Sequence, residues 1–294
     1  MKLEPSMIED KWPLTRVSLG SSLKGVGGQR HVQVLSASEG RYICKTADIS
    51  KSLDDLASDL LIFDFLRTKG FRYITRLLKT NNDQLFADIS GSLTYLLEFV
   101  EGKEPAPTPK NYAQLGKITA ELNSIDGYPN ATKFIPATII KQDLPKLTIG
   151  KSFHYEYLKL LETLPSFEDL PTALIHTDIA LVNSIQKEDG SIVLIDWDDI
   201  GIGTRILDVA FPLIQQFVSE DCEYDETNAK AFYTAYRQTV RLTDRELNNI
   251  FSAALFIAMM YIIYGDSDKR WQRIRWALRN RELLENAFRN NTSQ

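Results

Sequence analysis

Two short apolar runs, Ala173–Ile175 and Ile192–Ile195, each lead directly into polar residues that the interior of a buried strand would not carry. Asp178 follows the first run, Asn183 comes five residues later, and Asp196 ends the second run. Apolar runs of this length predict buried strands that must pack together. We therefore expect Asp178, Asn183 and Asp196, which lie at the ends of these segments, to converge on one small volume.

The spacing of these residues is H-x-D-x4-N, which begins at His176, and Asp196 follows thirteen residues after Asn183. Phosphoryl transfer from ATP requires a carboxylate that orients the acceptor's proton and oxygen ligands that hold Mg²⁺ against the phosphates. Kinases place these groups in this order, on a strand, a loop and a hairpin. The pattern therefore predicts phosphoryl transfer, while loop caps and turn formers remain the structural alternative for the same residues.

The N-terminal part predicts strands around a glycine-rich segment. The expected strands are residues 15–19, 31–35 and 41–46. Gly25, Gly27 and Gly28 lie between the first two strands, where a backbone without side chains can approach a ligand closely. Lys45 ends the third strand. The structural alternatives are an ordinary turn for the glycines and a side chain that reaches water for Lys45.

A helix is expected next, from Ser52 to Thr68, with Ser52 as its cap and Asp55 three residues on. Asp59 lies in the middle of this helix, close to its apolar stripe. It is either a functional acid or a solvated helix residue. Two more strands are expected, at residues 83–88 and 93–100.

Residues 103–109 (KEPAPTP) contain three prolines in seven positions, which excludes regular structure there. We place a domain boundary at this segment. Residues 1–102 form the predicted N-terminal domain, with the sheet and one helix. Residues 103–294 form a mainly helical C-terminal domain, which holds the candidate catalytic residues and the region expected to bind an acceptor.

Composition excludes several classes of protein. Lysine and arginine (34) are outnumbered by aspartate and glutamate (39), so the net charge of −5 argues against general nucleic-acid binding. The N-terminus lacks the apolar run of a secretion signal. The longest apolar stretch, residues 250–264, is shorter than the ~20 residues that span a bilayer, which predicts a buried core helix. We expect a cytoplasmic monomer or homodimer with no nucleic-acid or membrane partner.

Several stretches resemble the aminoglycoside phosphotransferase family, whose fold is shared by choline, homoserine and fructosamine kinases. They are IHTDIALVN, VLIDWDDIGIGTRILDVA, LLEFVEG, LGKITAELNSI and AFYTAYRQTVRLTDREL, and together they cover most of the chain in the expected order. The resemblance implies a bilobal, protein-kinase-like α+β fold with an antiparallel N-terminal sheet, one N-terminal helix and a mainly helical C-terminal lobe. It further implies that ATP and Mg²⁺ bind between the lobes and that the γ-phosphoryl group passes to a hydroxyl of a small molecule.

The resemblance also assigns roles in the catalytic region. Asp178 becomes the catalytic carboxylate, and Asn183 and Asp196 become ligands of Mg²⁺. His176 orients the loop, and Asp208 is a structural acid that braces it.

For the nucleotide, the resemblance makes Lys45 the contact to the α- and β-phosphates and Asp59 its partner on the helix. The main chain of Glu98, Phe99 and Val100 contacts adenine. The glycine-rich segment, with Gly25, Gly27 and Gly28, belongs to the same ATP site.

The chain departs from the family pattern at four places. Thr177 replaces the common glycine between His and Asp, and residues 180–183 read ALVN where H-P-x-N is usual. Asp59 is shorter than the usual glutamate, and Asn123 stands where a histidine is expected. None of these changes removes a group that the chemistry requires.

The sequence does not identify the acceptor, and it leaves two alternative functions. Asp196-Trp197 in place of D-F-G, and the absence of an A-P-E segment, favour the small-molecule branch over a protein kinase. A non-catalytic nucleotide-binding protein of the same fold is the other alternative. An acidic cluster either recruits a cationic acceptor or is a solvated loop; its members are Glu220, Asp221, Glu223, Asp225 and Glu226. The basic run 269–281 is interpreted as an amphipathic helix with tryptophans, Ile274 and Leu278 inside and arginines in water.

Overall fold

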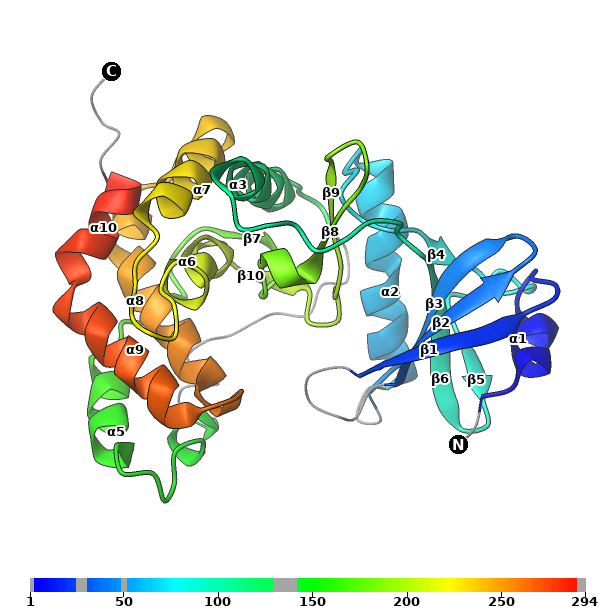
Figure 1. The fold of residues 1–294 in the computed structure, drawn as a ribbon, viewed down its shortest axis with the longest axis horizontal. Helices are drawn as coiled ribbons and strands as arrows, with labels where there is room; N and C mark the ends of the chain where they lie inside the picture. The colour runs from blue at the N-terminus through cyan, green and yellow to red at the C-terminus, as the bar shows by residue number, and fades with distance from the viewer. Residues whose placement is uncertain (1–2, 25–30, 49–51, 129–141, 290–294) are drawn as a thin grey trace. The chain divides into compact units, whose positions relative to one another are not determined.

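A computed structural model of the chain describes residues 3–24, 31–48, 52–128 and 142–289 (Figure 1). The chain divides into two compact units. The first unit comprises residues 1–103, 128–130 and 185–195, and the second unit comprises the rest. Gly25, Gly27 and Gly28, which we expect to be in the ATP site, lie outside the described residues.

The described part of the first unit contains an antiparallel sheet in the order β1-β2-β3-β6-β4, with β5 paired to β6. Its strands are β1 (Ser18–Lys24), β2 (His31–Ala37), β3 (Gly40–Thr46), β4 (Leu77–Leu78), β5 (Ala87–Ile89) and β6 (Ser92–Glu98). Two predicted strands were misplaced: the one expected at 15–19 begins at residue 18 and runs on, and the one expected at 83–88 is reduced to β5. Such short edge segments lack the sustained alternation that marks a strand.

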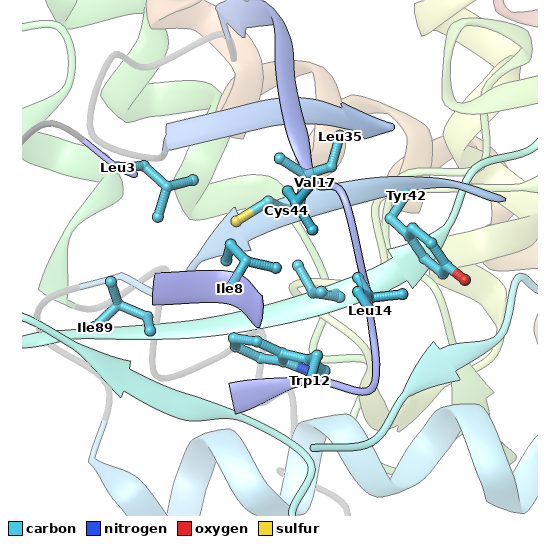
Figure 2. Packing of buried hydrophobic residues seen from close by; sticks show 10 residues of the cluster. Leu3, Ile8, Trp12, Leu14, Val17, Leu35, Tyr42, Cys44 and Ile89 are labelled. Atoms are coloured by element: carbon cyan, nitrogen blue, oxygen red, sulfur yellow. The ribbon is translucent and has the colours of Figure 1, made fainter. Parts of the chain in front are cut away.

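A short helix, α1 (Pro5–Lys11), forms a small core with the sheet, which the sequence analysis did not predict. Figure 2 shows Ile8, Trp12 and Leu14 packed toward Leu35 and Cys44 of the strands. Trp12 is fully buried, and its indole N–H donates to the carbonyl of Leu78 at 3.1 Å. Burial of each such side chain contributes about 1.5–3 kcal/mol, so these contacts hold the N-terminal segment on the sheet.

Helix α2 (Leu53–Thr68) is the predicted helix of the first unit. The Ser52 hydroxyl accepts from the Asp55 N–H at 3.1 Å and donates to the Asp55 carboxylate at 2.7 Å. Its buried residues include Leu56, Leu60 and Phe63, the apolar stripe expected from the sequence. Asp59 is half-buried beside that stripe.

Residues 185–195, which lie within the predicted C-terminal domain, pack in the first unit. They carry most of the hairpin of β8 (Ser184–Gln186) and β9 (Ile192–Leu194). The N–H of Gln186 donates to the Lys103 carbonyl at 2.8 Å, and the N–H of Leu194 donates to the Tyr73 carbonyl at 2.8 Å. Gly102 permits this contact, because a Cβ there would lie 2.3 Å from the Gln186 carbonyl oxygen.

The second unit is mainly helical. Its helices are α3 (Pro109–Asn123), α5 (His154–Thr163), α6 (Ile206–Gln215), α7 (Glu226–Thr239), α8 (Asp244–Met260), α9 (Ser267–Arg279) and α10 (Arg281–Arg289). Its described residues also form three single 3₁₀ turns: η1 (Leu144–Lys146), η2 (Leu181–Asn183) and η3 (Tyr261–Ile263). β7 (Thr172–Ile175) and β10 (Gly201–Thr204) form an antiparallel pair. Helices α3 and α7 pack closely, since a Cβ at Gly116 would lie 2.3 Å from the Phe232 carbonyl oxygen.

One helical stretch of the described chain, Asp244–Ile263, is long and apolar enough to cross a membrane by length and composition. Most of it is buried within the second unit, where α8 packs against α6. Such burial agrees with the core helix predicted at residues 250–264. At the start of the stretch, the Glu246 carboxylate accepts from both Arg205 Nε and Nη2, at 2.6 and 2.8 Å.

Helix α9 is amphipathic, as the basic run predicts, but two of its residues are placed differently. Trp271 and Ile274 are buried, as expected. Leu278 is 39% exposed, whereas Arg273 is only 7% exposed. Arg273 lies one turn before the buried Ala277, on the flank of the apolar stripe, so the buried face is wide enough to include an arginine that we expected in water.

Candidate functional site

The loop that follows β7 is held by a fully buried carboxylate, Asp208 of α6. Its two oxygens accept from the backbone N–H groups of His176, at 2.9 Å, and Thr177, at 2.8 Å. The Asn123 amide donates to the same carboxylate at 3.1 Å and accepts from the Tyr236 hydroxyl at 3.1 Å. Asn123, which departs from the family's histidine, thus supports Asp208 directly.

Burial raises the pKa of Asp208 to about 6, and the hydrogen bonds from His176, Thr177 and Asn123 oppose this increase. The carboxylate is therefore mainly ionised at neutral pH. An ionised carboxylate accepts all three N–H groups, whereas a protonated one loses acceptor capacity. This arrangement is consistent with the bracing role that the family resemblance gives Asp208.

Thr177 adopts a backbone conformation that favours glycine, with φ of +72°. A β-branched residue is an outlier in this region, and such a residue stores roughly 1–3 kcal/mol of strain. The family's glycine at this position is explained by the same geometry. The Asp208 hydrogen bond to the Thr177 N–H helps to hold the strained conformation.

A second brace, which the sequence analysis missed, comes from Gln216 just after α6. Its amide donates to the Ile179 carbonyl at 2.6 Å, and its side-chain oxygen accepts from the Leu181 N–H at 3.1 Å. Gln216 therefore holds the loop on both sides of Ala180. A glutamine at the end of a helix belongs to no known sequence motif, so this role could not be predicted from the sequence.

The structure brings Asp178, Asn183 and Asp196 close enough to interact electrostatically. Burial raises the pKa of the half-buried Asp178 carboxyl, and the negative charges of Asp196 and Asp199 raise it further. Hydrogen bonds from Asn183 and Tyr261 act in the opposite direction. Asp178 is thus a carboxylate in a cluster of acids, a setting that favours interaction with cations and with hydroxyl protons.

The oxygen atoms around Asp178 suit Mg²⁺ that is shared with substrate phosphates. The Asn183 amide N–H donates to the Asp178 backbone carbonyl at 3.1 Å, which leaves the Asn183 side-chain oxygen for another partner. Asp196 is exposed and has φ of +63°. In the part of the chain that the structure describes, no three His, Cys, Asp or Glu residues cluster as a metal site. Mg²⁺ needs only one or two protein oxygens when phosphates and water complete its shell.

His176 lies in the same region as a buried side chain rather than as a metal ligand. Its ring contacts the Trp197 ring edge-on, with the centroids 4.7 Å apart. The two rings join the residues that precede Asp178 to the residue that follows Asp196. This contact fits the loop-orienting role expected for His176.

Tyr261 is a candidate site residue that the sequence analysis interpreted only as part of an apolar core helix. It lies in η3, and its hydroxyl is close enough to the Asp178 carboxylate to lower the pKa of that group as a hydrogen-bond donor. Burial and the charge of Asp178 raise the pKa of Tyr261, so the phenol stays protonated and can donate.

We expect Tyr261→Phe to lower kcat about tenfold, because the loss of one hydrogen bond of about 1–1.5 kcal/mol leaves Asp178 less well oriented. Steady-state kinetics would measure the effect, and Tyr264→Phe, an exposed neighbour, is the matched control. A variant with unchanged kcat would remove Tyr261 from the site.

The predicted nucleotide residues lie in the first unit. Lys45 is 8% exposed on β3, where it pairs in register with Tyr95 of β6. Asp59 lies on α2 and contributes a negative charge that raises the pKa of Tyr128. The ion pair of Lys45 with Asp59 stays a prediction.

Backbone groups of the predicted adenine segment are partly used within the first unit. Glu98 donates its N–H to the Arg76 carbonyl at 2.8 Å, and its carbonyl accepts from the Thr75 hydroxyl at 2.7 Å. Phe99 donates its N–H to the Arg41 carbonyl at 3.0 Å. Among the described residues, the Phe99 carbonyl and both backbone groups of Val100 have no such partner. The segment also lines a cavity of about 520 Å³, whose lining residues do not include Lys45 or Asp59.

The acidic cluster is largely engaged in local structure. Asp225 caps α7 by accepting from the Asn228 N–H at 3.0 Å. Glu226 pairs with Lys230 at 2.6 Å, and Glu220 pairs with Lys269 at 3.6 Å. These contacts favour the structural interpretation of the cluster over the recruitment of a cationic acceptor.

The sequence of this chain matches a known protein family. Residues 23–242 match the phosphotransferase enzyme family, which is most of the chain and includes the loop, Asp196 and Asp208. The chain belongs to this family. The resemblance inferred from the motifs is thereby confirmed, and the phosphotransferase family supplies the general class of activity, phosphoryl transfer.

Solved structures of phosphotransferases and kinases show the same fold. An aminopropanol kinase associated with a microcompartment has a TM-score of 0.69 and 16% identity, with 95% of each chain covered. An aminoglycoside phosphotransferase from Alicyclobacillus acidocaldarius has a TM-score of 0.64 and 17% identity, covering 98% of this chain and 95% of that one. An amicoumacin kinase, solved with AMP-PNP and Ca²⁺, has a TM-score of 0.65 and 16% identity, covering 93% and 90%. The predicted kinase-like α+β fold is confirmed.

Proposed function

We propose that the chain is an ATP- and Mg²⁺-dependent phosphotransferase that moves the γ-phosphoryl group to a hydroxyl of a small molecule. The observation that carries this proposal is the grouping of Asp196 with Asp178 and Asn183, which lie on the loop braced by Asp208. Family membership supports the reaction class. The acceptor is a small molecule such as an antibiotic, an amino alcohol, a choline-like amine or a sugar.

In this proposal each residue has a separate task. Asp178 accepts a hydrogen bond from the acceptor hydroxyl, orients it for attack and takes up its proton. Asn183 and Asp196 hold Mg²⁺, which when bound neutralises charge on the phosphates. Asp208 keeps the loop in place through the His176 and Thr177 N–H groups. Catalysis then comes mainly from positioning, because the loose transition state requires little covalent chemistry.

Nucleotide binding is assigned to the first unit in the same proposal. Lys45 contacts the α- and β-phosphates, and Asp59 orients Lys45. The backbone groups of Phe99 and Val100 that have no partner among the described residues are available to adenine. A kinase of the same fold holds AMP-PNP and Ca²⁺, which supports a nucleotide and a divalent cation as cofactors.

A direct test is ATP consumption, measured with Mg²⁺ against a panel of acceptors. The panel includes aminoglycosides, macrolides, choline, homoserine, aminopropanol and simple sugars. We expect one class to raise ATP turnover far above the rate without acceptor. Transfer of labelled phosphate to a protein substrate would instead support a protein kinase. Absence of turnover with every acceptor, despite ATP binding, would support a non-catalytic nucleotide-binding protein.

Asp196→Asn should abolish the Mg²⁺-dependent part of nucleotide affinity, because a neutral amide cannot balance the charge of the cation. Calorimetric titration of ATP with and without Mg²⁺ measures this part separately. Asp169→Asn, at an 87% exposed side chain, is the matched control and should leave both titrations unchanged. Equal Mg²⁺ dependence in Asp196→Asn and the parent chain would reassign Asp196.

A further inference from the structure

A buried arginine of α9 has no carboxylate partner within the described part of the chain. Arg273 is 7% exposed. Its guanidinium donates from Nη2 to the Gln215 side-chain oxygen at 2.8 Å and from Nη1 to the Val218 carbonyl at 3.3 Å. Its buried Nε–H has no hydrogen-bond acceptor among the described residues. Within that part of the chain, the positive charge is therefore bonded to neutral oxygens.

The surroundings of Arg273 add donors and positive charge. Arg270 also donates to the Gln215 side-chain oxygen, at 3.5 Å. Burial lowers the pKa of Arg273 to about 10, and the charge of Arg270 acts in the same direction. The charge of Glu220 raises the pKa of Arg273, but Glu220 is 72% exposed and pairs with Lys269.

Gln215 supplies another buried donor. Two arginines donate to its side-chain oxygen, so a flipped amide would set donor against donor, and the orientation of Gln215 is fixed. Its Nε2 group is buried and has no acceptor among the described residues. Thus Arg273 and Gln215 are in contact through Nη2 and Oε1, and each carries a buried donor that lacks an acceptor among the described residues.

A small oxyanion supplies what this arrangement lacks. Buried charges in proteins are normally paired, and buried donors are normally satisfied. A carboxylate or phosphate group carries the negative charge and the oxygen lone pairs, and guanidinium groups bind both in a planar geometry. A single anion would therefore satisfy the charge of Arg273 and the donors of both residues.

Gln215 is a neighbour in the chain of a residue that holds the loop carrying Asp178. Gln215 precedes Gln216, whose side chain holds the loop at Ile179 and Leu181. An anion held by Gln215 would lie one residue along the chain from the brace of the loop that carries Asp178. Binding here is thus placed to influence that loop.

We propose that Arg273 and Gln215 form a binding site for a small anion, either a carboxylate or a phosphate group. The anion is a group of the acceptor itself or a separate ion. The site is distinct from the predicted ATP and Mg²⁺ residues, and anion binding here does not depend on the proposed reaction.

The test is thermal unfolding of the full chain with increasing inorganic phosphate, at constant ionic strength adjusted with sodium chloride. Phosphate should raise the Tm of the parent chain by about 2 °C or more as its concentration passes the dissociation constant. Arg273→Met should lose this response. The matched control is Arg275→Met, two residues along the same helix and exposed, which should retain it.

A second variant and a direct spectroscopic measurement keep the proposal testable if Arg273→Met does not fold. If Arg273→Met does not fold, Gln215→Leu removes the neighbouring donor and should also lose the response. The Arg273 Nε–H resonance, assigned with Arg273→Lys, should shift on addition of phosphate. The proposal is overturned if neither phosphate nor acetate raises the Tm of the parent chain. It is also overturned if phosphate raises the Tm equally in the parent and in the variants that fold.

Kinetics then distinguishes the two sources of the anion. If the acceptor carries the anionic group, phosphate competes with the acceptor, and Arg273→Met raises KM for the acceptor with little change in kcat. If the anion is separate, phosphate changes turnover without competing with the acceptor. Only this arm rests on the proposed function, so a failure of phosphoryl transfer leaves the thermal and spectroscopic tests intact.

Discussion

Replacing Asp178 with asparagine should lower kcat about 10²–10⁴-fold, the usual contribution of a positioned acid or base. Asparagine has nearly the same size but cannot take up a proton from the acceptor hydroxyl. KM for ATP should change little, because the predicted nucleotide contacts lie elsewhere in the chain. Steady-state kinetics with the acceptor identified by the panel would measure both constants.

Stability separates this catalytic role from a structural one. Burial raises the pKa of Asp178, which means that folding disfavours its charge. A neutral residue should therefore leave the Tm unchanged or raise it slightly. Asp169→Asn, at an 87% exposed side chain, is the matched control for the same substitution. A low Tm with near-normal kcat would show that Asp178 is a structural cap.

The local part of the site could be predicted from the sequence because its residues follow one another within a short stretch. Asp178, Asn183 and Asp196 are separated only by a loop and a hairpin, and the apolar runs beside them fix where the strands end. The structure brings these three together, and their catalytic roles stay predictions. Lys45 and Asp59 depend on contacts between distant segments, and their pairing stays a prediction as well.

The braces of the loop could not be predicted, because they join residues that are far apart in the sequence and carry no motif. Gln216 and Tyr261 are common residue types within or beside apolar helices, and only the packing of those helices brings them to the loop. Asn123 was identified only as a departure from the family pattern, whereas it contacts Asp208 from 85 residues away. Arg273 was misjudged because helical periodicity alone does not show how wide the buried face is.

Asp208→Ala should reduce the free energy of unfolding by roughly 2–5 kcal/mol, one of the largest effects of any single substitution in the second unit. It removes one acceptor from three buried donors: the N–H groups of His176 and Thr177, and the Asn123 amide. Urea unfolding would measure the loss. Because the same bonds hold the loop that carries Asp178, kcat should fall as well, even in the fraction that remains folded.

The pH dependence of this loss identifies Asp208 as its source. Its pKa is about 6 in the folded chain against an ordinary value of 3.8, so between these values the folded state binds more protons than the unfolded state. Stability contributed by this shift is present below pH 3.8 and is lost as the pH rises through 6. The difference in unfolding free energy between the parent and Asp208→Ala should therefore be larger near pH 4 than at pH 7, by about 2 kcal/mol. Glu223→Ala, at an exposed acid of the same unit, is the matched control. A difference for Asp208→Ala that does not vary with pH would mean that burial does not raise the pKa of this carboxylate.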